Sequence, residues 1–60
     1  MTTYEIYIKH APKKFEHIKT TTNKTELKQV IRENTTNGKT VTVIERYSCG
    51  TTCRAEYEAR

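Results

Sequence analysis

The sequence contains no aspartate and no tryptophan, one serine, one proline and two glycines. Without aspartate or a glycine-rich segment, the usual sets of nucleophile, base and orienting residue, and the usual phosphate-binding loops, are not assembled. The seven glutamates are dispersed and form no obvious acid and base pair. A chain of 60 residues also has little room for a concave active site. We therefore expect a protein that is not an enzyme and holds no cofactor.

Long apolar segments are also missing. There is no run of about 18 apolar residues that could span a membrane. The opening residues, MTTYEIYIKH, lack the charged and apolar regions of a signal peptide. We expect one small domain over residues 1–60 in the cytoplasm, where thiols stay reduced. The core of so small a domain contributes at most about 3–5 kcal/mol to its stability, so a disulfide, a metal ion or a partner subunit would add stability that it needs.

The first third of the chain predicts β structure. Tyr4, Ile6 and Ile8 alternate with polar residues, which indicates a half-buried strand over about residues 3–9. Pro12 then breaks the pattern. Residues 15–21 fit either a second strand or a helical turn, and the β-branched run IKTTT favours the strand. As a strand this segment needs a bulge to bring Phe15 and Ile18 to one face.

A helix is predicted over about residues 24–34. Asn23 can cap its start, and Glu26 can reach back to complete a capping box. Leu27, Val30, Ile31 and Asn34 share one stripe of the helix. Gly38 suits the turn that ends it.

The last third predicts a hairpin with strands at residues 40–48 and 53–59 and a loop at residues 50–52. In this register Cys49 faces Cys53, and the odd-numbered side chains form a mostly apolar face. The whole chain predicts an α+β fold in the order β-β-α-β-β, with one helix on one face of a four-stranded, mainly antiparallel sheet. The expected core is Leu27, Val30 and Ile31 against Tyr4, Ile6, Ile8, Val41, Val43 and Tyr57.

The two cysteines leave several interpretations open. The spacing C-x₃-C in a hairpin, with no helix after it, does not suit a thioredoxin-like redox pair. Two reduced thiols are the simplest interpretation, and a disulfide across the hairpin is an alternative. A further alternative is a structural zinc site formed by His10, His17, Cys49 and Cys53, although this spacing is not typical of zinc ligands.

The net charge of +4 arises in the first two thirds of the chain. Lys24, Lys28 and Arg32 recur every four residues along one flank of the predicted helix. Such a surface can bind nucleic acid or an acidic partner. The residues of this candidate contact set are Tyr7, Lys9, Lys13, Lys14, Lys24, Lys28 and Arg32.

A second kind of binding surface is an exposed sheet edge. The run KTVTVIERY is rich in β-forming residues and has few charges that would block pairing with another strand. It therefore predicts docking to another protein, or a homodimer, through an edge strand. The residues expected in that contact are Thr40, Thr42, Ile44 and Arg46.

These observations favour a small binding protein that docks onto a larger protein through a sheet edge or a helix face. The chain is rich in threonine, lysine and asparagine, which suits an accessory protein of a phage or another mobile element. The alternatives are a non-specific nucleic-acid binder that uses the basic helix flank, and a zinc-stabilised adaptor.

Overall fold

The structure is a computed structural model that describes residues 1–59 of the chain. It contains the predicted α+β fold in the predicted element order. The elements are β1 (Thr3–Ala11), β2 (Lys14–Thr21), α1 (Lys24–Thr36), β3 (Thr40–Arg46) and β4 (Thr52–Tyr57).

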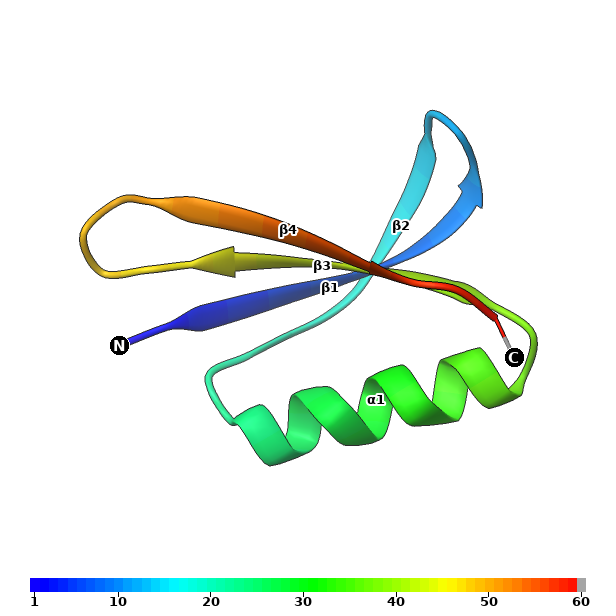
Figure 1. The fold of residues 1–60 in the computed structure, drawn as a ribbon, viewed down its shortest axis with the longest axis horizontal. Coiled ribbons are helices and arrows are strands. Elements are labelled where there is room, and N and C mark those ends of the chain that lie inside the picture. Colours follow the sequence, from blue (N-terminus) through cyan, green and yellow to red (C-terminus); the bar gives the residue numbers. More distant parts are fainter. Residues whose placement is uncertain (60) are drawn as a thin grey trace.

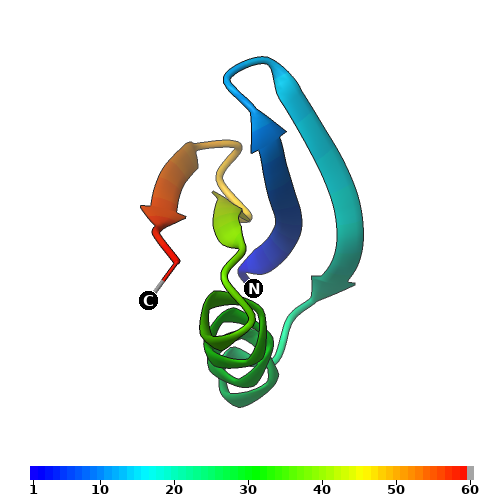
Figure 2. The ribbon, with the colours of Figure 1, turned by 90° about the vertical axis from the view of Figure 1, so that its right-hand side faces the viewer.

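The four strands form one antiparallel sheet in the order β2-β1-β3-β4. The helix lies on one face of this sheet, and the strands fan out above it with a marked twist (Figure 1). The view along the helix places α1 beneath the middle of the sheet, with β4 and β2 to either side (Figure 2). The opposite face, which we call the open face, has no layer of described residues upon it.

The first hairpin settles the structure of residues 15–21, which form a strand. Pro12 and Lys13 make its two-residue turn. Ile6 pairs with Lys19 while Tyr7 pairs with His17, so Ile18 is the extra residue of a β-bulge. The bulge that this strand was expected to need is therefore present.

The helix begins and ends at identifiable caps. The Asn23 side chain accepts hydrogen bonds from the backbone N–H groups of Thr25 (2.9 Å) and Glu26 (3.3 Å), as expected. The expected capping box is not formed, because the Asn23 N–H donates to the Thr21 hydroxyl and Glu26 pairs with Lys19. The helix continues two residues past its predicted end, to Thr36.

Gly38 ends the helix in a left-handed conformation, with a φ of 80°. Its N–H donates to the carbonyl of Thr35, and the N–H of Lys39 donates to that of Asn34. These are the two hydrogen bonds of a Schellman motif, in which glycine is favoured because it has no Cβ.

The core lies between α1 and the two central strands. The buried side chains are Tyr4, Ile6, Ile8, Leu27, Val41 and Val43, and Val30 and Ile31 pack against them. This confirms the predicted core except at Tyr57, which is 40% exposed. The exception arises because Tyr57 is on β4, which the helix does not cover.

The second hairpin has the predicted faces but a different register. Val43 pairs with Ala55 and Glu45 with Cys53, so the predicted pairing of Cys49 with Cys53 is wrong. Tyr47 N–H donates to the carbonyl of Thr51, and the turn between them contains Gly50 at a φ of 93°. This is a three-residue turn with a glycine bulge. The shift in register is an even number of residues, so each side chain stays on its predicted face.

The helix found among residues 1–59, α1, is not long and apolar enough to cross a membrane.

We predict that Leu27→Ala lowers the free energy of unfolding by about 2–5 kcal/mol, because it empties a site that is only 5% exposed. Ile31→Ala should cost less, since Ile31 is half-buried. Urea denaturation followed by circular dichroism measures both, with Lys28→Ala as the control on the same helix. If Leu27→Ala unfolds at the same urea concentration as Lys28→Ala, the assignment of the core is wrong.

Candidate functional site

A groove separates α1 from β4 on the helix side of the sheet. Its volume is about 420 Å³. Leu27, Ile31 and Tyr57 give it an apolar floor, and Glu45 contributes one carboxylate. Three cations of the helix line it as well, namely Lys24, Lys28 and Arg32. We call this feature the basic groove and its three cations the basic row.

The basic row carries three positive charges, and the single carboxylate of the groove, on Glu45, offsets at most one of them. Within residues 1–59 the ion pairs involve Lys9, His10, Lys19, Arg46 and Arg54 but no member of the row. The one carboxylate of the groove, on Glu45, accepts a hydrogen bond from the Tyr47 hydroxyl at 2.5 Å. This bond to Glu45 raises the pKa of Tyr47 to about 12. The groove therefore has an excess of positive charge.

The outer edge of β4 runs beside the basic groove. Tyr47 and Thr51 are a hydrogen-bonded pair of the hairpin, and such pairs recur at every second residue of an antiparallel ladder. Cys53, Ala55 and Tyr57 therefore turn their backbone N–H and C=O groups toward β3. It follows that residues 52, 54 and 56 turn theirs away from the sheet. This edge is regular, since the β3–β4 register has no shift.

The other edge of the sheet, β2, is less suited to pairing. Its bulge at Ile18 interrupts the ladder, and Lys14 and Lys19 lie along it. Bulges and lysines are both features that discourage an edge strand from pairing with another chain. Of the two edges, β4 is the better template for an added strand.

The predicted edge at β3 is wrong. β3 pairs with β1 on one side and with β4 on the other, so its backbone groups are already used. The four predicted docking residues, Thr40, Thr42, Ile44 and Arg46, lie along the open face of this central strand, opposite Lys9, Tyr7, Glu5 and Thr3 of β1. Thr42 is buried, and Arg46 donates to Glu5.

The predicted basic contact set is divided among three places. The basic row lies in the groove, whereas Tyr7 and Lys9 lie on the open face. Lys13 and Lys14 lie at the tip of the first hairpin. The structure therefore does not form one continuous basic surface from these residues.

Polar side chains on the open face satisfy one another. Glu5 accepts hydrogen bonds from Arg46 Nε (2.9 Å) and from the Tyr7 hydroxyl (3.1 Å). The bond from Arg46 lowers the pKa of the Glu5 carboxyl. Desolvation, together with the bond to Glu5, raises the pKa of Tyr7. These groups are held in a local network.

A small apolar hollow of about 160 Å³ lies beside this network. Phe15 and Ile44 are among its lining residues, and the Arg54 guanidinium stands 5.3 Å from the centre of the Phe15 ring. Thr42 lies at its base, and the Thr42 hydroxyl oxygen is buried with no hydrogen-bond partner among the described residues. Sequence reasoning missed this contact because Phe15 and Arg54 are on opposite edge strands, which the curvature of the sheet brings together.

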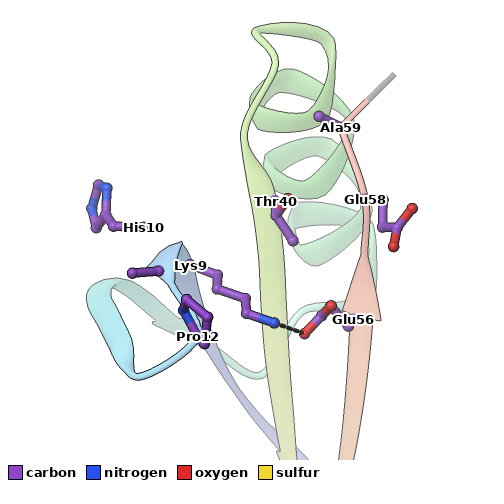
Figure 3. A pocket seen from close by; sticks show the side chains of 8 residues that line it. Lys9, His10, Pro12, Thr40, Glu56, Glu58 and Ala59 are labelled. Carbon is purple, nitrogen blue, oxygen red and sulfur yellow. Dashed lines mark hydrogen bonds and ion pairs between the residues drawn. The ribbon is translucent and has the colours of Figure 1, made fainter.

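A wider cleft of about 440 Å³ opens where the first hairpin leaves β3 and β4 (Figure 3). Lys9 Nζ and Glu56 Oε2 form an ion pair across it at 3.2 Å. His10 is among the residues that line the cleft, and its ring pairs with Glu16 at 3.0 Å. Glu58 adds a second carboxylate to the lining, so the cleft lacks the row of cations that marks the basic groove.

The alternative zinc ligands are not brought together. A hairpin loop at residues 11–14 would pair His17 with Ile8, on the face of His10, but in the structure His17 pairs with Tyr7 and lies on the open face. Within the described residues, no group of three or more ligand-type side chains could hold a metal ion. Cys49 and Cys53 are both free thiols, and both are exposed. A hydrogen bond with the Thr51 hydroxyl lowers the pKa of Cys49.

We predict that Thr42→Val stabilises the protein by about 1–3 kcal/mol, because it keeps the side-chain shape and removes a buried hydroxyl that has no hydrogen-bond partner within residues 1–59. The matched control is Thr35→Val. Thr35 is similarly buried, but its hydroxyl donates to the Ile31 carbonyl at 2.8 Å, so this change should destabilise. Thermal denaturation of both variants gives the comparison. A Thr42→Val protein that is less stable than the wild type would contradict the assignment.

No family model, curated protein or solved structure matches this chain. Its function is therefore argued from these surfaces, among which the β4 edge and the basic groove combine unpaired backbone groups, apolar area and charge of one sign.

Proposed function

We propose that this chain is a small non-catalytic binding protein that adds a strand of another protein to the outer edge of β4. The observation that carries the proposal is the regular, outward-facing edge of β4 beside the basic groove. An added strand would gain main-chain hydrogen bonds at residues 52, 54 and 56. Its alternate side chains would lie over the groove, where they cover Tyr57 and meet the basic row.

The composition of the groove favours a different protein over a second copy of this chain. If two copies paired through β4 in an antiparallel manner, both helices would lie on the same face of the joined sheet. The two basic rows would then face each other across the junction. Like charges placed opposite each other oppose association. An acidic partner has no such penalty.

The same charges also attract nucleic acid, which is the competing candidate. The apolar floor of the groove argues against nucleic acid. It is formed by Leu27, Ile31 and Tyr57, whose side chains would not contribute to binding a phosphate backbone. Tyr7, the aromatic residue of the predicted contact set, lies on the open face, where it cannot stack a base of a nucleic acid held by the basic row. These two observations support a protein partner.

The non-catalytic part of the proposal is supported by how the polar groups are used. Glu5 and Glu56 are each paired with a cation, and the single serine lies in an exposed turn. The setting we propose is the cytoplasm of a bacterial host, with the chain acting as an accessory protein of a phage or mobile element. The compositional bias of the sequence supports this setting.

Arg54→Pro tests the β4 edge directly. Proline removes the outward N–H at residue 54 without removing a hydrogen bond to β3, and edge strands tolerate proline at such positions. The matched control is Arg54→Ala, which removes the same side chain but keeps the N–H. Each immobilised protein is incubated with a nuclease-treated bacterial lysate, and the retained proteins are quantified. The wild type and Arg54→Ala should retain the same proteins in similar amounts. Arg54→Pro should retain at least about tenfold less of them, because it loses one main-chain hydrogen bond and its ring obstructs the added strand.

Two results would contradict the proposal. One is equal retention by Arg54→Pro and Arg54→Ala. The other is loss of all retained proteins after nuclease treatment, which would favour nucleic acid. Circular dichroism confirms that each variant is folded. If Arg54→Pro does not fold, chemical synthesis of the 60-residue chain with an N-methyl group at Arg54 removes the N–H and keeps the side chain.

A further inference from the structure

We infer that the docked strand carries acidic residues at every second position. This inference rests on the proposed docking at β4 and specifies the chemistry of the partner. Three features of the structure carry it, namely the spacing of the basic row, the direction of α1 relative to β4 and the lack of any ion pair on the three cations among the described residues.

The spacing of the row matches a strand. Lys24, Lys28 and Arg32 are four residues apart on a helix, which places them about 6 Å apart along its axis. Every second residue of a strand is about 6.6 Å from the next on the same face. Three acidic side chains at alternate positions therefore span about 13 Å, against about 12 Å for the basic row.

The directions are compatible with this match. α1 and β4 both run from left to right in Figure 1, and they line the same groove. A strand added to β4 therefore runs along the helix and passes all three cations. Its side chains opposite residues 53, 55 and 57 would be the ones that face the helix, because neighbouring strands place paired residues on the same face.

The local charges leave the row open to such a partner. None of the three cations has a carboxylate partner among residues 1–59. Glutamate suits the site better than aspartate, because its longer stem can cover the apolar floor at Tyr57 while the carboxylate reaches the rim. The inferred motif is Glu-x-Glu-x-Glu in an extended segment.

Three synthetic peptides of identical composition test the motif. TVETETEVT has glutamate at every second position, ETVETTVTE disperses the three glutamates, and EVTTEVTTE places them at every fourth position as a helix would. Each is titrated into ¹⁵N-labelled protein at millimolar concentration. The amide signals of Thr52–Tyr57 and Lys24–Arg32 report where it binds, and the titration gives the Kd.

We expect TVETETEVT to bind about tenfold more tightly than ETVETTVTE. It can form more ion pairs with the basic row, and because each exposed pair contributes only modestly to the binding free energy, the difference is limited to about this size. The signals of both β4 and α1 should move. In the variant Lys24→Gln, Lys28→Gln, Arg32→Gln the two peptides should bind equally. A matched control variant, Lys13→Gln, Lys14→Gln, Lys39→Gln, removes the same charge elsewhere and should keep the preference.

Other outcomes overturn the inference in distinguishable ways. Equal binding of all three peptides at β4 overturns the acidic motif and leaves the docking at β4 intact. Tightest binding by EVTTEVTTE would overturn the every-second-residue spacing, because its glutamates also share one face of a strand but lie twice as far apart. If no peptide moves the β4 signals, the motif is wrong, and the Arg54→Pro comparison then decides separately whether β4 docks a strand at all.

Discussion

The width of a single helix limits how much of the four-stranded sheet can be buried. An α-helix with its side chains is about 10–12 Å across, whereas four strands about 4.8 Å apart occupy about 19 Å. α1 therefore covers β1 and β3, where Ile6, Val41 and Val43 are almost fully buried. It cannot also cover the outer strands. The exposure of Tyr57 and the groove beside it follow from this mismatch.

The same constraint explains why the two edges differ. β2 leads directly into the helix, and its bulge and charges protect it from pairing. β4 follows a tight turn at the other side of the sheet and has no bulge. Its outer edge lies next to apolar area and the unbalanced basic row. The open backbone edge of β4, the apolar area at Tyr57 and the basic row therefore lie on one side of the molecule. A partner strand docked there would cover all three.

The features that could be predicted from the sequence are those that local periodicity and capping residues determine, namely the elements and the faces of their side chains. The alternation of Tyr4, Ile6 and Ile8 gave the first strand, and Asn23 gave the start of the helix. The face of each residue in the second hairpin was also correct. Its register was not, because a shift by an even number of residues keeps every side chain on the same face. Only the turn geometry around Gly50 decides between such registers.

Strand order was the other feature beyond local reasoning. The few charges in KTVTVIERY were interpreted as a sign of an available edge. In the structure they mark a central strand, since Thr42 is buried even on the open face. Lys14, Glu16 and Lys19 of β2, by contrast, have the charges of an edge. The basic row itself was correctly recognised from its spacing, but its position opposite Tyr57 depends on long-range packing that spacing does not encode.

Amide hydrogen exchange of β4 tests most directly whether its outer edge is open. The N–H groups of Cys53 and Ala55 should be protected, because they bond to β3, whereas those of Arg54 and Glu56 should exchange at rates close to those of an unstructured chain. The alternation must be measured on dilute protein without a partner. Protection of Arg54 and Glu56 as strong as that of Ala55 would show that the edge is already covered, and would contradict the docking of a partner strand on β4.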